Sequence, residues 1–427
     1  MRPVPGSMRL LAVEASQNGD YNRSRYQQAE QLGAELYVLN GLGSSDFWPA
    51  GRYRVAGSKH IDDIADAAGR WHASAAFDGV LTFAESALIA TAAVADALSL
   101  PGIGLPAART SRNKLLMHTA HQRAGAPVAG FRYAPSLAEG LAAADEFGYP
   151  VVIKPALGAS SSFVFLAEEP AGFRQRYAEA ARGAPAMKWT RLEADGVDLG
   201  PPGLLVESFL DGSEHLVEAV AWDGEVHLGS IADRVAAAMT TFEDNTHQAP
   251  TSLTAAQVNQ VRAAIAPAAA GHGLRRSALH AEVRFHRGVP HVLEVTPRPG
   301  GGGLEHMARV SAGYDPILAH LQVACGQRPS LRGYHPTGIC TATRALLCEA
   351  GRIASITVPA EVSQSADLLF CRIIAAPGDV IRRPPDGNGI LGFIGATGAS
   401  HGEAMAAAAR LAGQVTVTLD RQGRHAW

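Results

Sequence analysis

The sequence is poor in charge and contains no long basic or apolar run. Only 18% of the 427 residues are charged, and the formal net charge is -3. The absence of basic clusters argues against binding of nucleic acid, and no apolar run approaches the roughly 20 residues that a membrane helix needs. The opening MRPVPGSM lacks the apolar centre of a signal peptide, so we expect a cytoplasmic protein that does not contact a membrane.

Cysteine is also scarce. The four cysteines, Cys325, Cys340, Cys348 and Cys371, show no CxxC spacing, so nothing indicates a paired-cysteine motif. We expect reduced and mostly buried thiols, as is common in the cytosol. In contrast, 47% of the residues are hydrophobic, which is enough for a large core in a chain of two to four domains.

Short apolar stretches alternate with helical stretches in the first hundred residues. Strands are predicted over residues 8–13, 35–39 and 77–83, and helices over residues 24–32, 61–71 and 84–98. This β-α-β alternation predicts a parallel α/β domain that ends near Leu105.

A glycine motif follows that domain. Residues 102–107, GIGLPA, match a loose GxGxxA dinucleotide fingerprint. The motif should follow a strand, whereas this one follows a predicted helix, and we expect Pro106 to interrupt the helix that the motif must open. We therefore discount a dinucleotide site here.

The most informative stretch is residues 278–304, ALHAEVRFHRGVPHVLEVTPRPGGGGL. Its period-two pattern predicts a strand with Glu282 opposite the apolar face, a turn at Arg287-Gly288, and a returning strand that carries Glu294. Two carboxylates on adjacent strands repel each other unless a cation lies between them, and their oxygens suit Mg²⁺. Arg298, just beyond, would suit a phosphoryl group, although a hairpin with solvated acids is an equally simple interpretation of this segment alone.

Two lysines occur in settings that suit an anion. Residues 110–125 read as one helix with Lys114 near its start, where a cation opposes the helix dipole unless an anion is held there. A strand over residues 151–153 delivers Lys154 to a small-residue loop, Gly158 to Ser162, whose N–H groups and hydroxyls can surround phosphate oxygens. The P-loop sequence GxxxxGK[ST] is absent.

A third stretch, residues 204–221, contains two further acids. Glu207 ends an apolar strand, where an acid that binds an amine or hydroxyl fits better than a solvated one, and Glu214 opens the next strand. Residues 242–253 are polar and turn-rich, which is typical of a mobile loop over a site, and a helix is predicted over residues 252–271 with Ser252 or Thr254 as N-cap.

The order of these elements resembles the ATP-grasp superfamily. The resemblance rests on Lys114 on a helix, VVIKP with its small-residue loop, LLVESFLDGSE, and HAEVRF followed by HVLEVTPRPGGGG. It covers roughly residues 8–323. Within the superfamily, the tail past Gly333 and the polar loop before the helix at Ser252 are most similar to the carboxylate-amine and amino-acid ligase branch. It implies an ATP-grasp fold of mixed α/β and α+β domains: an N-terminal α/β domain (1–108), an ATP-grasp core (109–330) and a small C-terminal α+β lobe (331–427).

The resemblance also implies roles for individual residues. Lys114 and Lys154 match lysines that contact ATP phosphates, and Gly158, Ser160, Ser161 and Ser162 lie in the matching phosphate-covering loop. Glu207 matches a residue near the adenine amino group, Phe209 and Leu210 the adenine hinge, and Glu214 the ribose-binding acid. Glu282 and Glu294 match Mg²⁺ ligands, and Arg298 the arginine at the transferred phosphoryl group. The resemblance implies one or two Mg²⁺ ions, for which Mn²⁺ may substitute. The family usually has Asn at the position of Thr296, so binding of the second ion is in question.

The implied reaction is ATP-dependent amide formation through an acyl phosphate, with amino acids as the expected substrates and ADP and phosphate as products. The loops at 158–162 and 242–253 are candidate lids, and His247 or His280 could assist deprotonation of the amine, although a structural histidine is the simpler interpretation of each. Coupling to a nucleotide precursor or to bicarbonate, as in the purine and biotin branches, and a non-catalytic nucleotide-binding role remain alternatives. The resemblance also makes a homodimer possible.

The tail from Tyr334 reads as a small lobe without catalytic spacing. Strands are expected over residues 338–348, 351–356, 370–375 and 414–419, with a turn at 386–389 and a helix over 403–412. We expect this lobe to pack on the core and to cover the substrate end.

Overall fold

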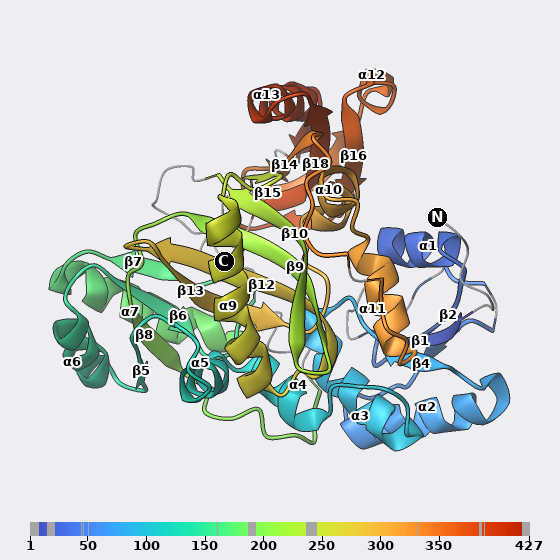
Figure 1. The fold of residues 1–427 in the computed structure, drawn as a ribbon, viewed down its shortest axis with the longest axis horizontal. Helices are drawn as coiled ribbons and strands as arrows, with labels where there is room; N and C mark the ends of the chain where they lie inside the picture. The colour runs from blue at the N-terminus through green and yellow to red at the C-terminus, as the bar shows by residue number, and fades with distance from the viewer. Residues whose placement is uncertain are drawn as a thin grey trace.

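The computed structural model describes residues 8–14, 22–43, 45, 47–49, 51–159, 161–186, 194–235, 246–330, 332–383, 387 and 389–420. Three main sheets and the helices packed on them make up this part of the chain (Figure 1). Among the described residues, no helix combines the length and the apolar character needed to cross a membrane.

The N-terminal domain is built around a four-stranded parallel sheet, as the sequence predicts. Its order is β3-β2-β1-β4, with bounds β1 Met8–Glu14, β2 Ala34–Asn40, β3 Tyr53–Val55 and β4 Gly79–Leu81. The accompanying helices are α1 Arg23–Gln31, α2 Ile61–Ala75 and α3 Leu88–Leu98, with a 3-10 turn, η1, over Glu85–Ala87. Helix α11, Pro316–Ala324, returns from far along the chain and buries Ile317 and Leu321 against this sheet.

Two predictions for the segment after α3 are wrong. Pro106 does not interrupt a helix, because α4, Leu105–Arg112, begins at Leu105 and holds Pro106 in its first turn, where a missing N–H costs nothing. The helix predicted over 110–125 is instead split at Asn113. The side chain of Asn113 accepts bonds from the N–H groups of Leu115 and Leu116 and so begins a new helix, α5, Lys114–Arg123.

A four-stranded antiparallel sheet forms one half of the core. Its order is β5-β8-β6-β7, with bounds β5 Phe131–Ala134, β6 Val151–Pro155, β7 Phe165–Ala167 and β8 Leu204–Ser208. Helices α6, Leu137–Phe147, and α7, Pro170–Gly183, bury their apolar residues against it. A short 3-10 turn, η2, follows α7 over Ala184–Ala186.

The other half of the core is an eight-stranded antiparallel sheet in the order β13-β12-β9-β10-β11-β14-β18-β16. Its bounds are β9 Glu214–Trp222, β10 Glu225–Arg234, β11 Thr246–Ala249, β12 Arg276–His286, β13 Val289–Thr296, β14 Cys340–Leu347, β16 Leu368–Ile373 and β18 Ile390–Gly398. Helix α9, Ala255–His272, packs on it and begins with the predicted Thr254 cap. Helix α10, Leu304–Ser311, follows the glycine run.

The C-terminal strands extend this core sheet. Strands β14, β18 and β16 continue it beyond β11, whereas β17 Val380–Ile381, β15 Gly351–Thr357 and β19 Thr416–Leu419 form a separate small sheet. Helix α13, His401–Ala412, covers this end, and α12, Ala360–Ser363, lies beside β16 (Figure 1). The pairing of β11 with β14 crosses the expected boundary at residue 331, and strand β18, which was not predicted, extends the sheet further.

Two further predictions need correction. Residues 246–249 form strand β11 and pair with β10 and β14, so this part of the expected loop at 242–253 belongs to the sheet, while residues 242–245 lie outside the described residues. The four cysteines are free, as expected, but only Cys348 is buried and the other three are partly exposed.

Candidate active site

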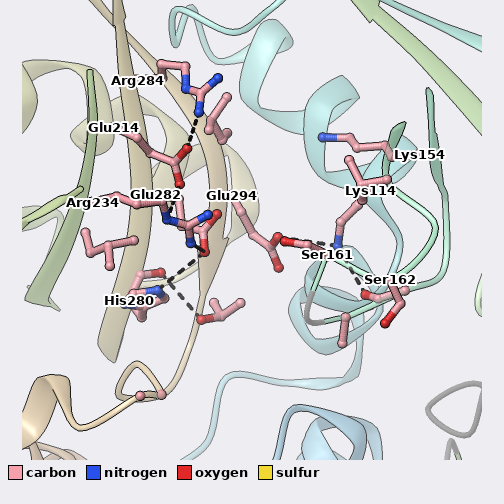
Figure 2. A pocket seen from close by; sticks show the side chains of 18 of the residues that line it. Lys114, Lys154, Ser161, Ser162, Glu214, Arg234, His280, Glu282, Arg284 and Glu294 are labelled. Carbon is pink, nitrogen blue, oxygen red and sulfur yellow. Dashed lines mark hydrogen bonds and ion pairs between the residues drawn. The ribbon is translucent and has the colours of Figure 1, made fainter. Parts of the chain in front are cut away.

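A cavity of about 290 Å³ lies between the two core sheets and collects the predicted site residues. Figure 2 shows Glu214, Glu282 and Glu294 on one side and Lys114, Lys154, Ser161 and Ser162 on the other. The predicted residues that line it are Lys114, Lys154, Gly158, Ser161, Ser162, Glu207, Phe209, Leu210, Glu214, Glu282, Glu294 and Arg298, together with His247, His280 and Thr296. Ser160 lies outside the described residues.

The paired carboxylates are as the sequence predicts. Glu282 on β12 is directly opposite Glu294 on β13, and the connecting turn has positive φ at Arg287 and Gly288. Burial raises the pKa of Glu294; Lys114 opposes this rise, and the carboxylates of Glu85 and Glu282 add to it. The pair thus brings the negative charge of two carboxylates to the cavity wall, where Lys114 lies 3.3 Å from Glu294 and His280 lies 3.8 Å from Glu282.

This charge fits a divalent cation. Carboxylate oxygens are the ligands that hard cations prefer. The described residues contain no group of three or more His, Cys, Asp or Glu side chains that could enclose a metal by themselves. Further ligands would have to come from water or from a phosphate, which suits an ion shared with a nucleotide. Thr296 is buried, and its hydroxyl lies 3.5 Å from the carbonyl oxygen of His280, to which it donates.

Lys114 joins the two sides of the cavity. Its Nζ lies 3.3 Å from Oε2 of Glu294 and donates to the carbonyl oxygen of Gly158 at 3.2 Å. Burial opposes its charge, but Glu294 and Glu85 still raise the pKa of Lys114, so it remains a cation. The first position of α5 therefore meets an anion, which is one of the two outcomes expected for a lysine at a helix start.

Lys154 has two buried partners; Glu207 was itself a predicted site residue, whereas His118 was not predicted. Its Nζ lies 2.6 Å from Oε1 of Glu207 and 3.1 Å from Nε2 of His118. Burial opposes the charge of Glu207, but Lys154 and His118 lower the pKa of this carboxyl to about 2. His118 follows Lys114 by four residues on α5, so it lies on the same helix face, and that spacing is a signal that could have identified it.

Glu85 is a site residue that the sequence did not reveal. It belongs to the 3-10 turn η1 of the N-terminal domain and accepts from Nη2 of Arg298 at 2.7 Å and from Arg112. Burial opposes its ionisation, but the two guanidinium groups lower the pKa of Glu85 to about 2. Glu85 belongs to the N-terminal domain, and it thus holds in position Arg298, the predicted phosphoryl-binding arginine of the core.

Glu214 and the two candidate histidines form the other side of the site. Glu214 accepts from Arg284 at 2.6 Å, and its other oxygen lies 3.1 Å from Arg234, so two arginines balance this acid. Burial opposes protonation of His280, but Glu218 and Glu282 raise its pKa to about 9. Burial lowers the pKa of His247 to about 3, and Arg234 adds to this effect. His280 is therefore charged at neutral pH, and His247 is neutral.

The glycine run after β13 has a steric cause. The N–H of Gly300 donates to Oε1 of Glu218 at 3.0 Å, and a Cβ at this position would lie 2.4 Å from the same oxygen and 2.5 Å from Nδ1 of His280. Only glycine allows the chain to pass this close, because such contacts are far below van der Waals distance. Gly301 and Gly302 then line the cavity.

Two family models match the chain. The ATP-grasp domain matches residues 147–305, and the L-amino acid ligase C-terminal domain 2 matches residues 344–420. The predicted ATP-grasp resemblance is thereby confirmed.

Individual relatives agree with these matches. The human carnosine synthase 1 is 27% identical over 265 residues, which cover 60% of this chain but only 31% of the synthase, so this chain spans about a third of that relative. The L-arginine-specific L-amino acid ligase of Bacillus subtilis is 22% identical over 309 residues, 71% of each chain.

The fold comparison covers almost the whole chain. The crystal structure of an L-amino acid ligase from Bacillus licheniformis superposes with a TM-score of 0.78 at 22% identity, over 97% of this chain and 100% of that one. This confirms the predicted ATP-grasp fold with its N-terminal α/β domain. The chain carries an ATP-grasp domain in residues 147–305, followed in residues 344–420 by an L-amino acid ligase C-terminal domain 2.

Proposed function

We propose that this protein uses ATP to join the carboxylate of one amino acid to the amine of another, with release of ADP and phosphate. The observation that carries the proposal is that one cavity is lined both by the lysines and acids of the ATP-grasp domain and by Ile374, Ile390 and Phe393 of the C-terminal domain. Charged groups suited to a nucleotide and apolar side chains in one cavity, together with the paired carboxylates, suit phosphoryl transfer to a bound acid.

The residues have distinct proposed roles. Phe209 and Leu210 contact the adenine with Glu207 near its amino group, and Glu214 binds the ribose. Lys114, Lys154 and the loop of Gly158, Ser160, Ser161 and Ser162 hold the phosphates. Glu282 and Glu294 hold one or two Mg²⁺ ions, for which Mn²⁺ can substitute, and this metal supplies positive charge at the phosphates when it is bound.

The first step transfers the γ-phosphoryl group. An oxygen of the substrate carboxylate attacks the γ-phosphorus, the bond to the ADP oxygen breaks, and an acyl phosphate forms. Lys154 and Arg298 stabilise the charge on the transferring oxygens, so no side-chain nucleophile is required. Glu85 holds Arg298 in place through their 2.7 Å ion pair.

The second step forms the amide. The amine nitrogen attacks the acyl carbon, phosphate leaves, and the nitrogen loses a proton. His247 and His280 line the cavity as candidate acceptors of that proton, although burial makes His247 a weak base and His280 already carries a proton at neutral pH. The acyl phosphate must be protected from water, and the loop that includes Gly158 and Ser161 is the remaining candidate lid from the described part of the chain.

The substrate class separates this proposal from the purine and biotin alternatives. The match of residues 344–420 to a domain named for L-amino acid ligases favours amino acids as substrates. The printed activities of the relatives, an L-arginine-specific L-amino acid ligase and a carnosine synthase, point in the same direction. Because the reaction consumes ATP, we place the enzyme in the cytoplasm.

A phosphate-release screen tests the proposal. The protein would be incubated with ATP, Mg²⁺ and pairs of amino acids, and mass spectra of the active mixtures would identify the product. We expect phosphate release that requires both a carboxylate and an amine, together with a dipeptide mass. Phosphate release that depends on bicarbonate or on a nucleotide precursor, and not on amino acids, would contradict the proposal.

A further inference from the structure

The active-site cavity has an apolar wall to which the proposed reaction gives no role. Three side chains of the C-terminal domain, Ile374, Ile390 and Phe393, form this wall. Ile390 and Phe393 belong to strand β18, and the N–H of Ile374 donates to the carbonyl oxygen of Leu391 at 2.9 Å, which keeps Ile374 beside that strand. The three side chains pack in one apolar cluster with Phe370. The wall is therefore one continuous apolar surface.

The wall lies next to the glycine run. Gly302 also lines the cavity, and a Cβ at this position would lie 3.7 Å from Cε1 of Phe393 and 3.6 Å from Cε1 of His247. The chain at Gly302 thus comes close to both rings. Because glycine has no side chain, position 302 leaves the space beside Phe393 open to a ligand.

His247 connects the apolar wall with the paired carboxylates. Its Nδ1 lies 3.4 Å from Oγ1 of Thr343, on strand β14. Burial is the largest influence on the pKa of His247, and the charges of Arg234, Glu282 and His280 also act on it. Coulomb interactions weaken with distance, so these three groups lie near His247. The wall is therefore on the side of the cavity that holds Glu282, where the proposed phosphoryl transfer places the carboxylate of the acid.

The charged groups of the cavity have partners inside the protein. Arg372, whose Cζ lies 5.7 Å from the centre of the Phe393 ring, pairs with Glu305. A charged or polar substrate side chain at the apolar wall would lose its water without gaining a partner from these three residues. The ion pairs among the described lining residues include Lys114–Glu294, Lys154–Glu207, Arg234–Glu214 and Arg298–Glu85.

We propose that the acid activated by this protein is an amino acid with a medium-sized apolar side chain, such as leucine or norleucine, and that this side chain packs against Ile374, Ile390 and Phe393. This inference rests on the proposed function and names its substrate class. The nucleotide does not need the apolar wall, because the adenine is assigned to Phe209 and Leu210.

Hydroxylamine in place of the amine makes the assay report on the acid alone. The full-length protein would be incubated with ATP, Mg²⁺, hydroxylamine and each standard amino acid or norleucine, and the hydroxamate measured. Leucine and asparagine have nearly the same shape, and lysine is norleucine with an added ammonium group. We expect kcat/KM to be about tenfold or more higher for leucine than for asparagine, and about 100-fold higher for norleucine than for lysine.

Two variants locate the side chain of the acid. Ile374→Glu places a carboxylate at a partly exposed position of the apolar wall, so the preference for norleucine over lysine should fall by about tenfold or more. Val380→Glu is the matched control, because it makes a similar change at a residue of the same domain that is 38% exposed and does not line the cavity. In this control the preference should stay within about twofold of wild type.

Three results would count against the inference, and they are distinguishable. Hydroxamate formation from lysine or asparagine that equals or exceeds that from the matched apolar acid would overturn the inference and leave the proposed function in place. A preference that is unchanged in Ile374→Glu would also overturn it, because the side chain of the acid would then lie elsewhere. Absence of hydroxamate with every acid would overturn the proposed function itself, and the inference with it.

Discussion

Two buried groups of charges in this protein differ in how their carboxylates are arranged. In the interdomain cluster of Arg25, Glu305 and Arg372, one carboxylate meets two guanidinium groups, at 3.2 Å and 3.4 Å. Burial opposes the charge of Glu305, but the two arginines lower its pKa to about 2. In the site pair of Glu282 and Glu294, two carboxylates face each other across adjacent strands, and the pKa of Glu294 is raised.

The difference separates stability from function. The interdomain cluster connects α1, α10 and β16, and it is complete without any ligand. The site pair instead places two carboxylates opposite each other on the wall of the cavity, where their oxygens can also hold a hard cation. We therefore expect substitutions in the interdomain cluster to change the free energy of unfolding, and substitutions in the site pair to change the rate.

The largest effect is expected for Glu294→Ala. Loss of one of the two proposed metal ligands should lower kcat by about 10²–10³. The free energy of unfolding should stay within about 1 kcal/mol of wild type, because removal of the like-charge contact with Glu282 offsets loss of the ion pair with Lys114. Phosphate-release assays and urea unfolding measure the two quantities. Glu225→Ala, at an exposed acid of β10, is the control, and near-normal phosphate release by Glu294→Ala would remove Glu294 from the site.

Glu305→Gln tests the opposite half of the comparison. An amide cannot neutralise Arg25 and Arg372, so the free energy of unfolding should fall by about 3 kcal/mol at pH 7. The exposed pair of Asp367 and Arg410 is the matched control, and Asp367→Asn should cost less than about 1 kcal/mol. Equal effects of the two substitutions would mean that the interdomain cluster is not a special source of stability.

The pH dependence of Glu305 follows from its lowered pKa. The folded protein favours the ionised form, so the stabilisation is fully present above the unfolded pKa near 4.5 and is lost as the pH falls from 4.5 towards 2. The difference in unfolding free energy between wild type and Glu305→Gln should therefore shrink over this range. If the difference in unfolding free energy between the two proteins stays constant down to pH 3, the lowered pKa of Glu305 is not the source of this stability.

Glu85→Gln should have an intermediate effect. Glu85 bonds to Arg112 and Arg298 and is proposed to position Arg298 without contacting ATP. The neutral amide should release Arg298 and lower kcat about 10- to 100-fold, with the KM for ATP nearly unchanged. Steady-state kinetics with varied ATP would check this. A change in KM alone would indicate a role in nucleotide binding instead.

The smallest effect is expected for Thr296→Asn. An amide oxygen is a better ligand for a hard cation than a hydroxyl, so the Mg²⁺ concentration for half-maximal rate should fall. Activity should stay within about tenfold of wild type, which is ~1.4 kcal/mol. An Mg²⁺ titration of both proteins measures this. A nucleotide complex with two full metal sites and the Thr296 hydroxyl bound to one of them would contradict a weak second site.

The sequence predicts those site residues that a local pattern positions. Alternation with a period of two identifies Glu282 and Glu294 because neighbouring strands of a hairpin fix which residues face each other. Lys154 is recognisable because it ends an apolar strand before a small-residue loop. These features depend on short stretches, and they agree with the structure.

The residues that the sequence does not reveal have partners far away in the chain. Glu85 meets Arg298 across 213 positions, and Arg25 meets Glu305 across 280. No local pattern distinguishes such acids from solvated ones. Strand β18 was missed because Gly392, Gly395 and Gly398 interrupt its apolar pattern. In the structure a Cβ would meet β16 at Gly392 and Gly395 and helix α13 at Gly398.

Trapping of the activated acid tests the central claim most directly. Wild-type protein would be incubated with ATP, Mg²⁺, a substrate amino acid from the screen and hydroxylamine in place of the second amine. The account predicts an amino acid hydroxamate with one ADP and one phosphate per hydroxamate, and none with Glu294→Ala. Formation of AMP and pyrophosphate with the hydroxamate would mean that the acid is adenylated, and would contradict the account.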